Sequence, residues 1–362
     1  MTHRLSFSRD PLSINSADSQ ALIAPMPPLR LSSPLPAAHR RQIFLSYAPD
    51  WLITVVLSAV FFSLDKVHGF RREFSLADAR HVFVTDFVSH LLALYMIAVV
   101  APVALAGLIN FVTFRSLWDL HNSLLGLALG LSITGSLTQI VKLVVGRPRP
   151  DILDRCQPIP GSVNPVYGLS NSSVCTTSDD AYILLDGFRS FPSGHSSLSF
   201  AGLGFLAFYL AGKLHLFNHR GYVAKAWLSL TPFIGAALVA ISRTMDNRHH
   251  WQDVLAGSAL GTAVSYFSYR QYYPSLASEV CHRPYAPRIT KSDLPSHHRQ
   301  SSSLQYRDDN QPTHEDVFGS GPLEGTVLRE GPGSLREAWN DGHHEEMTAQ
   351  PSVQQNGIPL ES

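Results

Sequence analysis

The sequence predicts an all-α polytopic membrane protein with about six transmembrane helices packed in a bundle. Two observations predict this fold class. Long apolar runs lie almost entirely within residues 44–275, and a span needs about 20 mainly apolar residues to cross the hydrocarbon core. A run such as 93–108 has no polar face, whereas a helix on the surface of a soluble protein carries an apolar stripe opposite a polar one. A large soluble core of buried helices is therefore disfavoured.

Six candidate spans account for the apolar runs. In order they are residues 44–64, 87–111, 120–145, 198–217, 226–241 and 254–273. The first is interrupted by Pro49 and Asp50, and the fifth is short, which suits a helix packed inside a bundle. Together they predict one six-helix transmembrane domain over residues 44–275.

The two ends of the chain differ from this middle region. Residues 1–43 and 276–362 are polar and rich in Pro, Ser and charge, so we expect disordered tails there. The start has no apolar core of the kind a secretory signal requires. We interpret the C-terminal tail as a cytosolic regulatory or trafficking segment. The formal net charge is +0, which gives no basic surface for nucleic acid.

An even number of spans places both termini on one side and the loops 65–86, 146–197 and 242–253 on the other. Lys and Arg are plentiful on both sides, so charge does not orient the bundle. The glycosylation sequon that begins at Asn171 favours the lumen or the exterior for the long loop. Cys156 and Cys175 share that loop, and they are either unpaired thiols or a disulfide in an oxidising compartment.

Three polar clusters stand at predicted helix ends, all on the side of these loops. They are Lys142 with Arg149 and Pro150, then Pro192-Ser193-Gly194-His195, then Ser242-Arg243 with His249 and Asp253. Each cluster alone has an ordinary explanation, such as a cation that snorkels to the membrane interface or a helix cap. Three clusters in order on one side indicate a shared site.

The residue types fit phosphate. Lys142, Arg149 and Arg243 supply three cations, and the guanidinium fork matches phosphate oxygens. Ser193 and Gly194 precede a predicted helix, whose free N–H groups and dipole favour an anion. We therefore expect a phosphate-binding site.

Histidines supply the chemistry. His249 and Asp253 are four residues apart, so they would share one face of a helix, and a carboxylate on one ring nitrogen leaves the other free as a nucleophile. His195 could then protonate the leaving alkoxide. His250 is also within helical reach of Asp253, as a structural or substrate-contacting residue. Spacing alone favours His249 modestly.

The three clusters resemble the signature of the type 2 phosphatidic acid phosphatase superfamily, K-x6-R-P, P-S-G-H and S-R-x5-H-x3-D, at every specified position. The resemblance covers about residues 45–275. The neighbouring sequences Gly-Arg-Pro-Arg-Pro-Asp and Arg-His-His-Trp-Gln-Asp look most like eukaryotic lipid phosphate phosphatases, among them fungal enzymes that act on diacylglycerol pyrophosphate and phosphatidate.

This resemblance implies a hydrolase with a phosphohistidine intermediate. His249 would attack phosphorus, Asp253 would orient it, and His195 would act as acid and then as base. The phosphate would be held by Lys142, Arg149, Ser193, Gly194 and Arg243. The family's lipid phosphatases need no metal, and no tight carboxylate cluster is evident beside the motifs, so we expect neither a metal nor another cofactor.

Several alternatives stay open. The same scaffold could serve a lipid phospho-headgroup transferase or a non-catalytic relative, although His195, His249 and Asp253 are intact. The predicted spans disfavour a soluble haloperoxidase, and charges that cluster at helix ends disfavour a transporter. The expected partners are a lipid phosphate and membrane lipids. The preferred lipid, homo-oligomerisation and the organelle (vacuole, Golgi or ER, or plasma membrane) are left open.

Overall fold

The computed structural model describes residues 37–78, 87–217, 221–288 and 326–327. Residues 1–42 and 43–362 form two compact units, and of the first only the opening turns of one helix are described. Throughout the described ranges the structure is helical, with isolated β-bridges in place of strands. The all-α prediction is confirmed.

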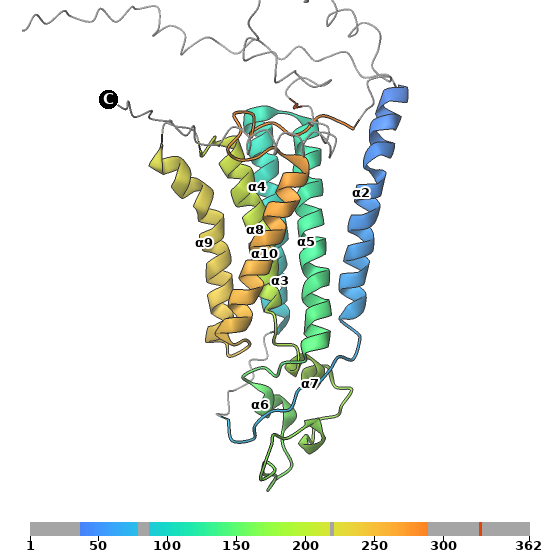
Figure 1. The fold of residues 1–362 in the computed structure, drawn as a ribbon, viewed down its shortest axis with the longest axis vertical. Coiled ribbons are helices and arrows are strands. Elements are labelled where there is room, and N and C mark those ends of the chain that lie inside the picture. Colours follow the sequence, from blue (N-terminus) through green and yellow to red (C-terminus); the bar gives the residue numbers. More distant parts are fainter. Residues whose placement is uncertain (1–36, 79–86, 218–220, 289–325, 328–362) are drawn as a thin grey trace, which may run out of the picture. The chain divides into compact units, whose positions relative to one another are not determined.

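In the part of the chain that the structure describes, nine helical segments make up the bundle (Figure 1). In chain order they are α2 (Ala37–Leu64), α3 (Phe87–Tyr95), η2 (Met96–Val100), α4 (Ala101–Ile109), η3 (Asn110–Phe114), α5 (Leu117–Val145), α8 (Gly194–Lys213), α9 (Val223–Met245) and α10 (Trp251–Tyr272). The segments η2 and η3 are short π-helices. η2 joins α3 to α4 and η3 continues α4, so the four segments form one continuous helical stretch that contains the second predicted span.

Within the described residues, four stretches are long and apolar enough to cross a membrane, namely Ile43–Leu64, Leu91–Phe114, Leu117–Val145 and Val223–Met245. The other two predicted spans coincide with α8 and α10, whose buried faces carry many serines and glycines. The polytopic architecture is thus confirmed, while the count of six stays a prediction. The fifth span was predicted too short, since α9 has 23 residues, and α2 continues through Pro49.

α8 lies at the centre of the bundle, against α5, α9 and α10. Its backbone approaches its neighbours closely at two glycines. A side chain at Gly202 would collide with the carbonyl of Ala98 in η2, and one at Gly261 of α10 would collide with the carbonyl of Ser197. Small residues that let helix backbones meet in this way are typical of membrane bundles.

Large apolar side chains point outwards along the helices. Leu52 of α2, Phe111 of η3 and Leu238 of α9 are each more than half exposed. Such a surface would be costly in water but is expected where lipid tails surround the helices. The protein is therefore an integral membrane protein.

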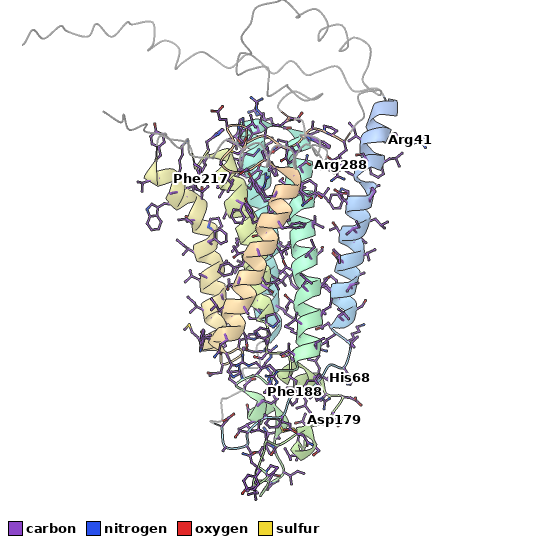
Figure 2. The ribbon with its side chains drawn as sticks, viewed as in Figure 1. Arg41, His68, Asp179, Phe188, Phe217 and Arg288 are labelled. Carbon is purple, nitrogen blue, oxygen red and sulfur yellow. A yellow bond between two sulfur atoms is a disulfide. The ribbon has the colours of Figure 1, made fainter. Side chains whose placement is uncertain are left out.

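The loops predicted to lie together do so in the part of them that the structure describes. Residues 65–78, 146–193 and 246–250 gather at one end of the bundle, and His68, Asp179 and Phe188 mark this end in Figure 2. Backbone hydrogen bonds join them, from Phe70 to Leu143 (2.8 Å) and from Ser193 to Asp253 (3.0 Å). We call this end the loop end.

The long loop of the loop end folds into a small unit of its own. It contains α6 (Ile152–Cys156), η4 (Ser172–Val174) and α7 (Tyr182–Gly187). A disulfide joins Cys156 to Cys175, which resolves the choice that the sequence left open. Side chains of α6 and α7 pack around Phe188 and Phe74, so the unit has its own apolar core.

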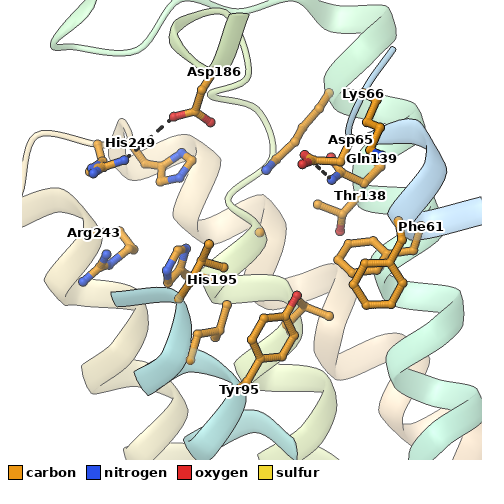
Figure 3. Close-up of a pocket in the computed structure, with 18 of the residues that line it drawn as sticks. Phe61, Asp65, Lys66, Tyr95, Thr138, Gln139, Asp186, His195, Arg243 and His249 are labelled. Carbon is orange, nitrogen blue, oxygen red and sulfur yellow. Dashed lines mark hydrogen bonds and ion pairs between the residues drawn. The ribbon is translucent and has the colours of Figure 1, made fainter. Parts of the chain in front are cut away.

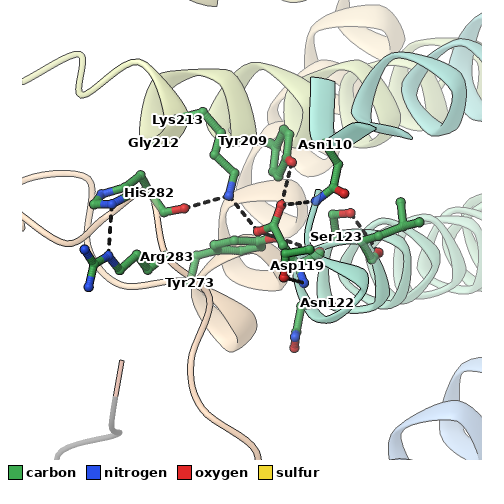
Figure 4. A network of polar contacts seen from close by, with 12 residues as sticks. Asn110, Asp119, Asn122, Ser123, Tyr209, Gly212, Lys213, Tyr273, His282 and Arg283 are labelled. Carbon is green, nitrogen blue, oxygen red and sulfur yellow. Dashed lines mark hydrogen bonds and ion pairs between the residues drawn. The ribbon is translucent and has the colours of Figure 1, made fainter. Parts of the chain in front are cut away.

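The opposite end is organised around a buried carboxylate (Figure 4). Asp119 accepts hydrogen bonds from Lys213 (2.6 Å), Tyr209 (2.8 Å), Tyr273 (3.0 Å) and Asn110 (2.9 Å). These groups come from α5, α8, η3 and the residue after α10. The network therefore ties four parts of the bundle together far from the loop end.

Both predicted domain boundaries need correction. α2 begins at Ala37, inside the segment predicted as a disordered tail. After α10 the folded chain continues past residue 275 to Arg288, where Trp118 donates to the carbonyl of Tyr285 (2.9 Å) and Arg288 pairs with Asp50 (2.9 Å). The remaining tail residues, 1–36 and most of 289–362, lie outside the described residues.

Candidate active site

A cavity of about 630 Å³ opens at the loop end, and most of the predicted site residues line it (Figure 3). The predicted residues in its wall are Lys142, Arg149, Gly194, His195, Arg243 and His249. They come from α5, α8, α9 and the loops that connect them. The structure thus brings the three sequence clusters to one place. Ser193 and Asp253 lie just behind this wall.

The N-terminus of α8 forms one side of the cavity. Ser193 caps this helix by accepting a hydrogen bond from the N–H of Ser196, and it donates its own N–H to the carbonyl of Asp253 (3.0 Å). A Cβ added to Gly194 would lie 3.1 Å from Lys142 Nζ. The ammonium group therefore stands directly beside a helix N-terminus, a combination that favours a phosphate dianion.

The turn after α5 carries Arg149 into the same wall. α5 ends at Gly146, whose φ of 56° lies in the left-handed region that glycine adopts without strain. Arg149 is buried, and its Nε and Nη2 donate to the backbone and side chain of Asp186 at 2.8 and 2.6 Å. Two of its nitrogens are thus fixed, and the third, Nη1, makes no hydrogen bond within the described part of the chain.

Two further arginines border the cavity. Arg243, in the last turn of α9, hydrogen-bonds to Ser242 Oγ (3.0 Å) and pairs with Asp246 (2.9 Å). Arg248 was not predicted; its Nη1 lies 3.8 Å from Asp186 Oδ2. Sequence reasoning missed it because the family pattern leaves that position unspecified.

His249 is held in one tautomer by the backbone. Its Nδ1 lies 2.7 Å from the carbonyl oxygen of Ser190, and the side chain is only 4% exposed. A carbonyl oxygen accepts but cannot donate, so Nδ1 carries the proton and Nε2 keeps its lone pair. Burial and the neighbouring cations Arg149 and Lys142 hold the pKa of His249 well below its ordinary value of 6.5. The ring is therefore neutral at physiological pH, as a nucleophile must be.

The predicted direct contact between Asp253 and His249 is replaced by a linked one. α10 begins only at Trp251, so His249 lies outside the helix and the four-residue spacing does not place the two side chains together. Asp253 instead accepts from Ser190 Oγ (2.5 Å) and Arg147 Nη1 (2.6 Å). Ser190 therefore stands between them, with its hydroxyl on Asp253 and its carbonyl on His249.

His250 has a structural role in this arrangement. It caps α10, and its backbone N–H donates to Asp253 Oδ2 (3.2 Å) while its Nδ1 lies 3.3 Å from the same oxygen. Asp253 is completely buried. These contacts fix the carboxylate that supports Ser190.

His195 faces the cavity from the first turn of α8 (Figure 3). Its Nε2 is buried and has no hydrogen-bond partner in the described part of the chain. A buried imidazole nitrogen without a partner is rare unless a ligand completes it. This geometry suits a group that transfers a proton to or from a bound molecule.

Comparisons with known proteins agree on one family. A model of the PAP2 superfamily matches residues 123–276. Lipid phosphate phosphatase 2 of Arabidopsis thaliana is 38% identical over 252 residues, covering 69% of this chain and 85% of that protein. Diacylglycerol pyrophosphate phosphatase 1 of Saccharomyces cerevisiae is 36% identical over 251 residues, covering 68% and 85%. The probable enzyme of that name in Schizosaccharomyces pombe is 37% identical over 242 residues, covering 65% and 84%.

The class that these findings define is a polytopic membrane hydrolase of phosphoric esters. More particularly, the chain belongs to the PAP2 superfamily and to its lipid phosphate phosphatases. No solved structure matches this chain significantly.

Proposed function

We propose that this protein hydrolyses lipid phosphate monoesters or pyrophosphates, such as phosphatidate and diacylglycerol pyrophosphate, through a phosphohistidine intermediate at His249. The observation that carries the proposal is the Nε2 lone pair of a buried neutral imidazole, held by Ser190, in a cavity whose wall includes the cations Lys142, Arg149, Arg243 and Arg248. The relatives that are named as phosphatases of these lipids support the substrate class.

In the first step His249 Nε2 attacks phosphorus. The N–P bond forms as the bond to the leaving oxygen breaks, and His195, as imidazolium, gives its proton to that oxygen. Lys142, Arg149 and Arg243 offset the charge of the phosphoryl oxygens. Because these donors are preorganised in a site of low polarity, they stabilise the charge that develops in the transition state.

In the second step the roles of His195 reverse. The neutral imidazole takes a proton from water, the hydroxyl oxygen attacks phosphorus, and the N–P bond breaks to release inorganic phosphate. Asp253 accepts a hydrogen bond from the Ser190 hydroxyl and so positions Ser190, whose carbonyl keeps His249 in the tautomer that both steps require.

The rest of the cavity wall supports a lipid substrate. Away from the cations it is lined by apolar side chains of α2 and α3, including Phe61, Leu91 and Leu94. Phe62 also lines it and is 60% exposed on the side of the bundle. A substrate could therefore place its phosphate on the cations while its hydrocarbon chain follows this wall towards the membrane.

The cations carry the charge stabilisation in this proposal, so the reaction needs no divalent metal. Among the described residues no group of three or more His, Cys, Asp or Glu side chains is placed to hold a metal ion. We further propose that the loop end faces the lumen or the exterior. The Cys156–Cys175 disulfide and the exposed Asn171 of the sequon, both in the long loop, support that orientation.

The test is phosphate release from phosphatidate and from diacylglycerol pyrophosphate by purified protein in detergent micelles with excess EDTA. We expect release by the wild type, no release by His249→Ala, and wild-type rates for His68→Ala. His68 is a matched control because it is an exposed histidine at the same end. Wild-type protein that is inactive on both lipids, or an active His249→Ala variant, would contradict the proposal.

A further inference from the structure

The carboxylate of Asp186 lies at the cavity but outside every motif. Asp186 belongs to α7 in the long loop, lines the cavity beside His249 (Figure 3), and is 7% exposed. An acidic group near a phosphate site would repel the substrate, so its presence needs a reason. Its contacts supply one.

The first oxygen of Asp186 is used by Arg149. Arg149 Nη2 donates to Oδ1 at 2.6 Å, and Nε donates to the Asp186 backbone carbonyl at 2.8 Å. The backbone of Arg149 is also held against α7, because its N–H donates to the carbonyl of Gly187 (2.8 Å). Since a guanidinium is planar and rigid, fixing two of its nitrogens fixes the direction of the third, which is left for a substrate oxygen.

The second oxygen of Asp186 faces two more arginines. Arg155 Nη1 donates to Oδ2 at 2.9 Å, and Arg248 Nη1 lies 3.8 Å from the same atom. Arg155 is anchored in turn by Asp151 (2.9 Å) and precedes the disulfide residue Cys156. One carboxylate is therefore shared by three guanidinium groups, two of which border the cavity.

The charge state of Asp186 fits this role. Burial alone would raise the pKa of its carboxyl group, but Arg149, Arg155 and Lys142 outweigh burial and hold the pKa well below its usual range. The carboxylate is therefore ionised at every pH at which the enzyme would work. It also offsets part of the repulsion among cations that a small cavity brings together.

We propose that Asp186 is a positioning residue for phosphoryl transfer, which aims Arg149 at the transferred phosphoryl group by holding its other donors and keeps Arg248 beside the cavity through an ion pair. The inference rests on the proposed function and adds a residue that the three sequence clusters do not contain. Asp186 does not touch the substrate; it acts through the two arginines. Its loss should therefore weaken contacts that are strongest in the transition state.

Orthovanadate gives a direct readout, because it adopts the five-coordinate geometry of phosphoryl transfer. For Asp186→Asn we expect a fall in kcat of about tenfold or more on phosphatidate, with a smaller change in KM. The inhibition constant for vanadate should rise by a similar factor, because inhibitor and transition state use the same arginine contacts. Asp179→Asn is the matched control, because Asp179 is an exposed aspartate of the same loop and pairs with Arg71. This substitution should change neither kcat nor the inhibition constant for vanadate.

A merely structural role gives a different result. If Asp186→Asn only reduced the fraction of folded protein, kcat would fall while the vanadate inhibition constant stayed at the wild-type value, and this would overturn the inference. Should Asp186→Asn not yield monodisperse protein, Asp186→Glu decides in its place. Glu keeps the charge but displaces it by one methylene, so kcat should fall and the vanadate inhibition constant should rise together. An unchanged inhibition constant would again overturn the inference.

The two proposals fail differently. A wild-type protein that releases no phosphate from any lipid phosphate contradicts the proposed function, and the inference falls with it. An active wild type, a dead His249→Ala variant and an unaltered Asp186→Asn variant contradict the inference alone.

Discussion

At the scale of single residues, the site depends on Ser190. This serine connects the buried carboxylate of Asp253 to the imidazole of His249 through its hydroxyl on one side and its carbonyl on the other. The carbonyl alone fixes the tautomer of His249, while the hydroxyl and Arg147 satisfy Asp253. We therefore expect loss of His249 to reduce activity most, loss of Asp253 to reduce it less, and loss of the Ser190 hydroxyl to reduce it least.

Ser190→Ala should therefore reduce activity without abolishing it. The variant loses one hydrogen bond to a charged group, which is worth about 1.5–3 kcal/mol, and keeps the backbone contact to His249. We expect kcat/KM to fall by about tenfold or somewhat more, and Asp253→Ala to be lower still. Steady-state kinetics on phosphatidate would check this, with the exposed Ser178→Ala as control. A Ser190→Ala enzyme as active as the wild type would refute the linkage.

The pH dependence follows from the environment of His249. The nucleophile must be neutral, and burial together with Arg149 and Lys142 lowers its pKa below 6.5. Protonation removes the nucleophile, so the contribution of His249 to activity is present above its lowered pKa and is lost as pH falls through it. The acidic limb of the kcat/KM profile should therefore lie below pH 6.5.

Removing one of the cations should move that limb. In Arg149→Gln the repulsion that disfavours the imidazolium is smaller, so the limb should shift upwards towards 6.5 even though the rate is lower. A profile of kcat/KM against pH for both proteins tests the prediction. An acidic limb at or above 6.5 in the wild type would contradict it.

The sequence located the motif residues but not their supporting contacts. Lys142, Arg149, His195, Arg243 and His249 meet in one cavity as the three clusters predicted. Ser190, Arg147 and Arg248 were missed because they lie in irregular segments, where no periodicity indicates which side chain turns inward. Asp186 was missed because α7 has only six residues, too few for a periodic pattern to show its inward face. Tertiary contacts between residues some 40 to 100 positions apart bring them together.

At the scale of elements, helix existence was predictable and helix ends were not. Apolar runs long enough to span a membrane indicate where the helices are. Their ends are decided by caps: Ser193 starts α8, and the reciprocal contacts of His250 and Asp253 start α10. That second cap is why the helical spacing of His249 and Asp253 misled the sequence interpretation.

The disulfide of the long loop should stabilise the element that carries Asp186. It joins residues 19 positions apart, and closing a loop of about that size is worth roughly 3 kcal/mol. We expect Cys156→Ser/Cys175→Ser to melt at a lower temperature and to lose activity on warming before the wild type does. Cys281→Ala, which removes the free cysteine, is the control. If the double variant and the wild type gave identical melting and inactivation curves, the disulfide would not stabilise the site.

At the scale of the whole molecule, chemistry and stability are separated along the bundle. The loop end carries the cavity, while the opposite end carries the Asp119 network and the chain that follows α10. The sequence indicated the first of these ends through its motifs. It did not predict the second, because Asp119 and Lys213 are 94 positions apart in the sequence and no spacing pattern connects them.

Breaking the Asp119–Lys213 pair should therefore cost stability but not chemistry. Both side chains are buried, and removal of one partner leaves an unpaired buried charge at a cost of about 3–5 kcal/mol. Lys213→Met should lower the melting temperature in detergent and leave kcat per folded molecule unchanged. Lys225→Met, which alters a lysine outside the network, is the control. A normal melting temperature, or a lowered kcat in folded protein, would contradict this separation.

The mixed wall of the cavity has a consequence for the direction of the reaction. With cations at one end and half-exposed Phe62 at the other, the two products of the proposed hydrolysis would part into different phases. Inorganic phosphate would leave to the aqueous side, whereas the dephosphorylated lipid would remain dissolved in the bilayer. The reverse reaction needs both products in one cavity at the same time, so their separation into two phases would make it slow wherever the phosphate concentration is low.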